Sequence, residues 1–136
     1  MFLLDTDTVI YCLKGQETVI RNLKNHRQDP LKISTITLLE LYYGAYKSEK
    51  VTGNLAKVKR IESDFDTIAV DFSIAGTFGM LKSSLETQGL PLDDFDLVIA
   101  ACALTRNLVL VTNNTKHFQR VEGLKLENWT LSPEPR

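Results

Sequence analysis

The stretch Phe2-Leu3-Leu4-Asp5-Thr6-Asp7-Thr8-Val9 (residues 2–9) passes from three apolar residues straight into two acids that are separated by a threonine. The three apolar residues suit a short buried strand, and Val9, Ile10 and Leu13 then mark one face of a helix that stops near Gly15. A strand that leads through acids into a helix is the first unit of an α/β fold, with polar side chains at the strand's end.

The alternation of strand and helix continues along the chain. Further strands are predicted at residues 31–35, 67–70, 108–111 and 125–127, and further helices near residues 19–23, 37–47, 55–65, 74–85 and 94–105. Strands separated by helices imply right-handed crossovers, and hence one parallel sheet with helices on both faces. We predict a single α/β domain over residues 1–131, in three layers (α/β/α), and a short C-terminal tail over residues 132–136.

The composition suits one cytoplasmic domain. A chain of 136 residues with 43% hydrophobic and 24% charged residues can form one core. No apolar run approaches the roughly 20 residues of a membrane helix, and residues 1–5 lack the basic region of a secretory signal. Cys12 and Cys102 lie far apart in apolar stretches, which predicts buried, reduced thiols.

The charge is unevenly distributed. The formal net charge of −1 is unlike that of a typical nucleic-acid-binding domain, which is basic. Residues 47–60, however, contain five cations and a single acid, Glu49. An acidic metal site in a chain with a basic flank would give this balance, and so would a solvated helix face.

The acids of the first motif are the strongest candidates for a functional site. Helix capping by Asp or Thr is worth about 1 kcal/mol, and it explains only one residue among Asp5, Thr6 and Asp7. It does not explain Asp5, which follows the buried strand without a break. We interpret Asp5 as a metal ligand or catalytic residue, and Asp7 as either a helix cap or a site residue.

Glu40 and Asp96 are the other two candidates. Glu40 lies in an apolar helical segment, where a buried carboxylate is costly unless it is paired or bound to metal, and Tyr43 extends an apolar face on the same side. Asp96 opens the most apolar helix of the chain. Because Asp93 or Asp94 can cap that helix, Asp96 is expected to face a protein-lined space instead.

A polar segment at residues 112–115 follows the strand at residues 108–111 and so reaches the same edge of the sheet. Side chains in such a position hydrogen-bond to ligand carboxylates or hold a metal-bound water. We assign this supporting role to a small set of residues and leave Asn113 to an ordinary Asn-rich turn. The set consists of Thr6, Asp7, Thr112 and Asn114.

Carboxylates gathered at one edge repel each other by on the order of 4 kcal/mol per pair at about 4 Å and an effective dielectric constant near 20. Proton sharing or a bound cation must offset this repulsion. Oxygen ligands select Mg²⁺ or Mn²⁺, and such an ion supports hydrolysis of a phosphodiester. A paired-histidine nuclease has little support, because His26 falls in a polar surface loop and His117 is also expected at the surface, where it could touch RNA.

In their order and spacing, residues 3–7, 35–45, 96–101 and 110–114 resemble the PIN-domain family and the VapC-type toxins within it, and residues 118–129 are also similar. The resemblance implies a parallel-sheet α/β/α sandwich, dependence on Mg²⁺ or Mn²⁺, and endonucleolytic cleavage of RNA. It also implies inhibition by a cognate VapB-type antitoxin whose tail enters the site, and assembly as a homodimer or a toxin–antitoxin hetero-oligomer.

The resemblance assigns metal binding to Asp5 and Asp96, with Glu40 completing the acidic set. The sequence departs from the family pattern at two positions. Asp7 stands where the family commonly has Asn, and Asn114 stands where some members have a fourth Asp. The resemblance therefore leaves open whether one or two metal ions bind.

Two other functions fit parts of the sequence. Residues 5–9 also resemble the first motif of haloacid-dehalogenase-type phosphatases, but the acids at residues 93–96 here precede the strand that ends at Thr112, which is the wrong order for that family. A non-catalytic binding module is the second alternative, with residues 47–60 as its docking face. An enzyme should lose its function with Asp96→Asn and still bind its partners, whereas a binding module should be unaffected.

Overall fold

The computed structural model describes residues 1–132, which form five strands and seven helices. In chain order these are β1 (Phe2–Leu4), α1 (Thr6–Leu13), α2 (Glu17–Asn25), β2 (Leu31–Ser34), α3 (Thr35–Lys47), α4 (Val51–Asp64), β3 (Asp66–Ile68), α5 (Phe72–Thr87), α6 (Asp94–Thr105), β4 (Val109–Val111), α7 (Thr115–Phe118) and β5 (Leu126–Glu127). Of the predicted tail, residues 133–136 lie outside the described residues. Within residues 1–132, no helix is long and apolar enough to cross a membrane.

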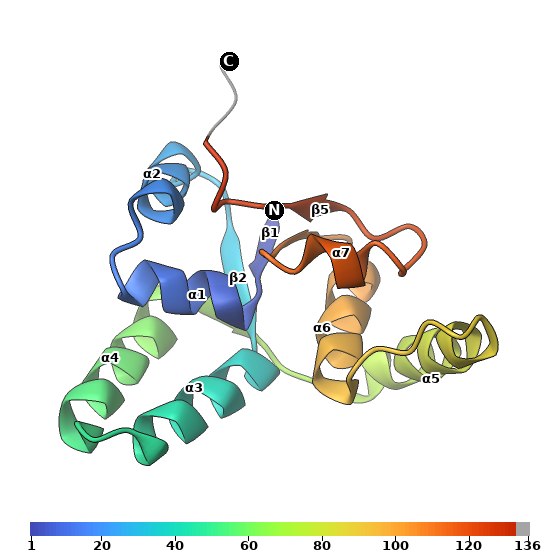
Figure 1. The fold of residues 1–136 in the computed structure, drawn as a ribbon, viewed down its shortest axis with the longest axis horizontal. Helices are drawn as coiled ribbons and strands as arrows, with labels where there is room; N and C mark the ends of the chain where they lie inside the picture. Colours follow the sequence, from blue (N-terminus) through green and yellow to red (C-terminus); the bar gives the residue numbers. More distant parts are fainter. Residues whose placement is uncertain (133–136) are drawn as a thin grey trace.

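The five strands of the described chain pair in parallel in the order β3-β2-β1-β4-β5. β1 lies at the centre, with Phe2 opposite both Leu31 of β2 and Val109 of β4. The chain builds the sheet outward from β1 through β2 and β3, and then crosses back to add β4 and β5 on the other side (Figure 1). Open α/β sheets bind ligands beyond the strand ends at such a reversal, which here means the ends of β1 and β4.

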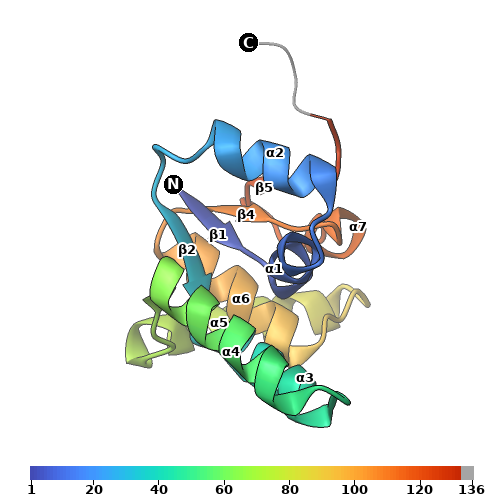
Figure 2. The ribbon, with the colours of Figure 1, turned by 90° about the vertical axis from the view of Figure 1, so that its left-hand side faces the viewer.

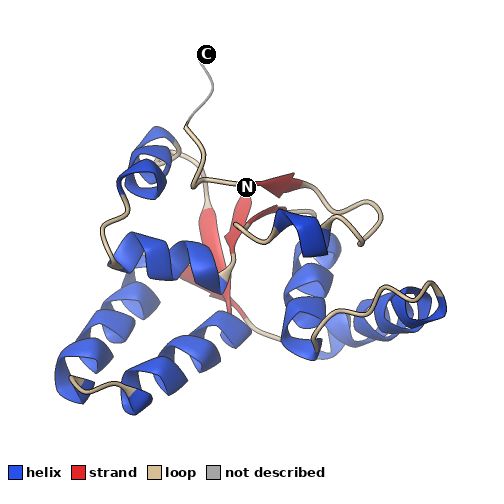
Figure 3. Cartoon of the chain, viewed as in Figure 1, coloured by secondary structure: helices blue, strands red, loops and turns tan. Residues whose placement is uncertain are grey.

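Side chains of the sheet alternate between two cores, because successive residues of a strand point to opposite faces. Leu3 and Leu110 join the core that contains α5 and α6, whereas Phe2, Leu4 and Val111 join the core that contains α1, α3 and α4. The ribbon views show helices on both sides of the sheet (Figures 2 and 3). This three-layer arrangement confirms the predicted fold class.

Helix α6 is the most deeply buried helix. Its residues Ile99, Ala100, Ala101, Cys102 and Ala103 are each at most 1% exposed. A helix buried all round needs no polar face, which explains the continuous apolar run in the sequence. The acids of its first turn are therefore carried on a rigid, well-packed element.

The predicted element boundaries agree with the structure to within a few residues, and the exceptions have local causes. α3 begins at Thr35 rather than at Thr37, because the Oγ of Ser34 caps the helix by accepting from the backbone N–H of Thr37 at 3.2 Å. α7 was not predicted. It is a single helical turn that Phe118, which is fully buried, anchors to the core.

Two predictions about burial were wrong. Cys12 is only half-buried, although Cys102 is buried as predicted, and both thiols are free. His26 lies in the turn directly after α2, as its C-cap, but it is half-buried, because its ring stacks on that of Trp129 with 4.7 Å between centroids. The ring of Phe2 meets both of them edge-on. This aromatic cluster fastens the C-terminal segment to the first strand.

Candidate active site

Asp5 lies where β1 ends and α1 begins, and it is 6% exposed. Its backbone N–H donates to the carbonyl of Val111 at 2.9 Å, which continues the pairing of β1 with β4. Its Oδ1 accepts from the backbone N–H of Thr6, and its Oδ2 accepts from the Thr112 hydroxyl, both at 2.8 Å. Asp5 is therefore the N-cap of α1, which corrects the expectation that capping does not account for it. The cap uses Oδ1, and Oδ2 faces the end of β4.

Asp7 turns toward the end of β4 and does not cap the helix. Its Oδ2 accepts from the backbone N–H of Asn113 at 3.1 Å and lies 3.4 Å from the Thr112 hydroxyl. Its Oδ1 accepts from the hydroxyl of Thr8 at 3.2 Å. Thr112, which is fully buried, thus stands between the carboxylates of Asp5 and Asp7.

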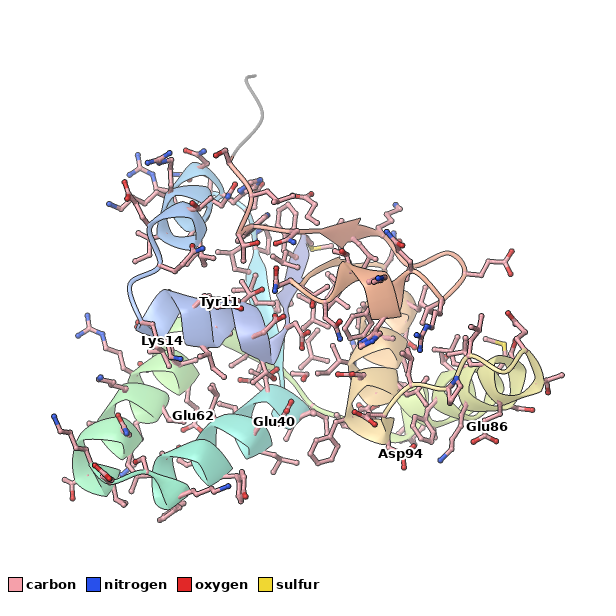
Figure 4. The ribbon with its side chains drawn as sticks, in the orientation of Figure 1. Tyr11, Lys14, Glu40, Glu62, Glu86 and Asp94 are labelled. Carbon is pink, nitrogen blue, oxygen red and sulfur yellow. The ribbon has the colours of Figure 1, made fainter. Side chains whose placement is uncertain are left out.

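Glu40 reaches the same place from α3 (Figure 4). Its Oε1 accepts from the hydroxyl of Thr6 at 2.8 Å, and that hydroxyl also lies 3.0 Å from the hydroxyl of Thr37. The half-buried carboxylate of Glu40 is therefore tied to the start of α1. The expected reason for its orientation was wrong, because Tyr43 is 66% exposed and forms no inward apolar face.

Asp96 is half-buried in the first turn of α6. Asp93 takes the N-cap position and Asp94 binds the ammonium of Lys82 at 2.8 Å, so capping does not require Asp96. Burial is the largest cause that raises the pKa of Asp96, followed by the charges of Asp93 and Glu40, with a smaller effect from Asp7. Asp96 therefore lies within electrostatic reach of the acids on α1 and α3.

The electrostatics of the site favour a cation. Burial, and then the charge of Asp7, raise the pKa of Asp5 to about 7, although the hydrogen bonds from Thr112 and Thr6 act in the opposite direction. Burial likewise raises the pKa of Asp7. Folding thus buries acids close to one another, where their negative charges are unfavourable. A bound cation would offset this electrostatic free-energy cost.

The residues suit a hard divalent ion that keeps part of its water shell. Within residues 1–132, no three or more Asp, Glu, His and Cys side chains form a cage that could hold a metal ion. Mg²⁺ does not require such a cage, because it is usually held by one or two carboxylates and several waters. The oxygen-only donors and the raised pKa of Asp5 both fit an ion of this kind.

Backbone N–H groups, which residue types do not predict, complete the site. Asn113, expected in an ordinary turn, supplies the N–H that binds Asp7. Asn114 contributes its backbone N–H, which donates to the Thr112 hydroxyl at 3.0 Å. His117 is exposed, as expected, and its charge lowers the pKa of Asp96. The residue type of Asn113 did not indicate this role, because every residue except proline has a backbone N–H. The only signal in the sequence was the Asn-rich turn composition.

A groove with a volume of about 380 Å³ adjoins the site between α1, α3 and α4. Apolar residues such as Ile10, Leu41 and Val58 line most of it. Glu40 stands at the end shared with the site, and Lys14 of α1 also lines the groove (Figure 4). The groove suits an extended or helical segment with apolar side chains.

The sequence model of the PIN domain matches residues 2–124. The chain belongs to the PIN-domain family. This result agrees with the resemblance found in the sequence and decides against a phosphatase of the haloacid-dehalogenase type.

Within that family, several relatives of the chain are named VapC. The chain is 40% identical over 129 residues to the tRNA(fMet)-specific endonuclease VapC of Shigella flexneri, covering 95% of this chain and 98% of the relative. It is 39% identical over 133 residues to ribonuclease VapC2 of Rickettsia felis, covering 95% and 98%.

Solved structures of VapBC complexes contain chains with the same fold as this chain. The chain superimposes on a chain of the crystal structure of VapBC2 from Rickettsia felis bound to a promoter DNA fragment with a TM-score of 0.89 and 35% identity, covering 94% of this chain and 98% of that one. It superimposes on a chain of DNA-bound VapBC from Salmonella typhimurium with a TM-score of 0.88 and 36% identity, covering 94% of this chain and 97% of that one.

Proposed function

We propose that this chain is the toxin of a VapBC-type toxin–antitoxin pair, an endoribonuclease that hydrolyses RNA phosphodiester bonds with Mg²⁺ or Mn²⁺. The observation that carries the proposal is the gathering of Asp5, Asp7, Glu40 and Asp96 beyond the ends of β1 and β4, where burial and the neighbouring charge raise the pKa of Asp5 to about 7. The names of the relatives, ribonuclease and endonuclease, support the same chemistry.

Asp5, Glu40 and Asp96 are the proposed metal-holding and catalytic residues. They come from three different elements, the N-cap of α1, α3 and α6, and their carboxylates would hold the ion. When bound, such an ion neutralises the acids and polarises a phosphodiester. Asp5 and Asp96, whose pKa values are raised, gain most from that neutralisation.

The supporting residues orient these carboxylates. Thr6 holds Glu40, and Thr112 holds Asp5, in each case through a hydroxyl at 2.8 Å. Asp7 adds negative charge beside Asp5. Asn114 holds the Thr112 oxygen from the other side through its backbone N–H. Together these contacts fix the carboxylates before any ligand arrives, which limits the reorganisation needed on binding.

A VapB-type antitoxin is the proposed partner, because the superimposed structures are VapBC complexes. The groove between α1, α3 and α4 is its proposed docking place. Its apolar lining would take the apolar face of a segment, and its acidic end at Glu40 would attract a cationic side chain. A segment bound in this way would block the site.

Transfer RNA is the first substrate class to test, since two relatives are named tRNA(fMet)-specific endonucleases. The purified chain is incubated with initiator tRNA and total RNA in Mg²⁺ or Mn²⁺, and the products are separated on denaturing gels. We expect discrete fragments that disappear with EDTA and with Asp96→Asn.

Asp94→Asn is the matched control for this experiment. Asp94 lies two residues away in the same turn, but it pairs with Lys82 at the surface, with 63% of its side chain exposed. Such a pair contributes about 0–1 kcal/mol, so Asp94→Asn should cleave RNA as the unmodified chain does. Fragments that persist in EDTA, or equal activity of the Asp96 and Asp94 variants, would count against a metal-dependent nuclease.

A further inference from the structure

Thr37 is a fully buried threonine in the first turn of α3, three residues before Glu40. Its hydroxyl lies 3.0 Å from the hydroxyl of Thr6. Within residues 1–132, Thr6 is the one hydrogen-bond partner of the Thr37 hydroxyl, and no buried side-chain nitrogen or oxygen is left without a partner. The hydroxyl of Thr37 therefore bonds to Thr6, and not to a group of α3 itself.

The direction of the hydrogen bonds follows from counting protons. A threonine hydroxyl has one proton to donate and two lone pairs that accept. The carboxylate of Glu40 can only accept when it is charged, so the proton of Thr6 points to Oε1 of Glu40, 2.8 Å away. The oxygen of Thr6 is then free to accept, and Thr37 supplies the proton.

We propose that Thr37 is a positioning residue for the metal site, a role that rests on the proposed function. Its hydroxyl donates to Thr6, which fixes the rotation of the Thr6 hydroxyl and aims that proton at Glu40. Hydrogen bonds in such a chain polarise and strengthen one another. The carboxylate of Glu40 is thereby held in one orientation for the ion.

The hydroxyl of Thr37 is separable from its part in the helix. The backbone N–H of Thr37 makes the cap contact with Ser34, and this contact is independent of the side chain. Valine is branched at Cβ and close to threonine in shape, and both residues are restricted at χ1. Thr37→Val therefore removes the hydroxyl and leaves the helix start in place.

Binding of Mn²⁺ alone to the purified full-length chain tests the proposal. The free Mn²⁺ signal in electron paramagnetic resonance gives the dissociation constant without any need for RNA cleavage. Thr37→Val should weaken Mn²⁺ binding on the order of tenfold, the lower end of the range for residues that support metal ligands. Thr37→Ser, which keeps the hydroxyl, should stay within about twofold of the unmodified chain.

A double variant identifies the route of the effect. Because Thr37 acts through Thr6, adding Thr37→Val to Thr6→Val should weaken binding no further. Thr35→Val is the matched control. Thr35 lies in the same turn, but its hydroxyl donates to the carbonyl of Ile68 at 3.1 Å, away from the site, so Mn²⁺ binding should not change.

Several results would overturn the proposal. These are unchanged binding by Thr37→Val, equal weakening by Thr37→Ser, a further loss in the double variant, or the absence of Mn²⁺ binding by the unmodified chain. Circular dichroism in EDTA checks that each variant folds, and Thr37→Ala replaces the valine variant if that variant does not. A chain that binds Mn²⁺ but cleaves no RNA would refute the proposed function and leave the result for Thr37 standing.

Discussion

Replacing Asp5 by Asn should make the metal-free chain more stable at pH 8, even though Asp5 is at the centre of the proposed site. Burial and the charge of Asp7 raise the pKa of Asp5 from 3.8 to about 7. Asn caps helices as well as Asp does, so the contact with the backbone of Thr6 can persist. The substitution then removes a charge that the folded chain disfavours.

The magnitude follows from linkage between protonation and folding. A pKa that rises from 3.8 to about 7, at roughly 1.4 kcal/mol per unit, corresponds to about 4 kcal/mol. Between these two values the native state keeps a proton that the unfolded chain releases. The free energy of unfolding therefore falls as the pH rises through this interval, and it is lowest above pH 7. Asp5→Asn should remove this part of the pH dependence and raise stability at pH 8 by up to about 4 kcal/mol.

Urea unfolding followed by circular dichroism, in EDTA at pH 5 and pH 8, measures the effect. Added Mg²⁺ should then stabilise the unmodified chain more than Asp5→Asn, because the ion binds only the folded site. Asp71→Asn is the matched control. Asp71 is an exposed cap whose pKa is lowered, chiefly by its hydrogen bond from the Ser73 hydroxyl, so its replacement should not raise stability at pH 8.

Equal stability of Asp5→Asn and the unmodified chain at pH 8, with the same loss between pH 5 and pH 8, would refute this reasoning. It would mean that the folded chain tolerates the charge of Asp5 without a cation. The electrostatic argument for a metal would then lose its main support.

Three further outcomes are expected. Thr112→Val should slow RNA cleavage by about 10–100-fold, because the acids after β1 lose a shared hydroxyl, and Thr112→Ser should retain most of the rate; equal single-turnover rates would contradict this. Gly79→Ala should raise the free energy of unfolding by roughly 0.8 kcal/mol, because Gly79 lies within α5 and a Cβ there would meet open space. Gly89→Ala should lower the free energy of unfolding, because the backbone of Gly89 has φ +71°, which strains alanine. Melting midpoints in the reverse order would count against this reasoning. Asn22→Ala should cost about 1–3 kcal/mol in urea unfolding, because its buried amide donates to the carbonyl of Trp129 at 3.0 Å, and an unchanged midpoint would rule that contact out as a source of stability.

The candidate site was only partly predictable. Asp5 could be chosen because an acid directly after a buried strand is conspicuous, and Asp96 because it opens an apolar helix that other acids can cap. Glu40 was chosen for an incorrect reason: the Thr6 hydroxyl and not an apolar face at Tyr43 orients it. The part played by Asn113 could not be predicted, because it depends on a backbone N–H, which does not distinguish one residue type from another.

The sequence by itself determined the local elements and the acids at their ends. Apolar spacing marks strands and helices because burial selects that spacing, and it does so without reference to distant residues. The tertiary structure alone decided which ends meet. β4 pairs with β1, so the hydroxyl of Thr112 reaches Asp5 across 107 positions of the chain, and α3 packs so that Glu40 meets Thr6. These contacts depend on the strand order, which is set when helices cover both faces of the sheet, and no local pattern in the sequence contains that order.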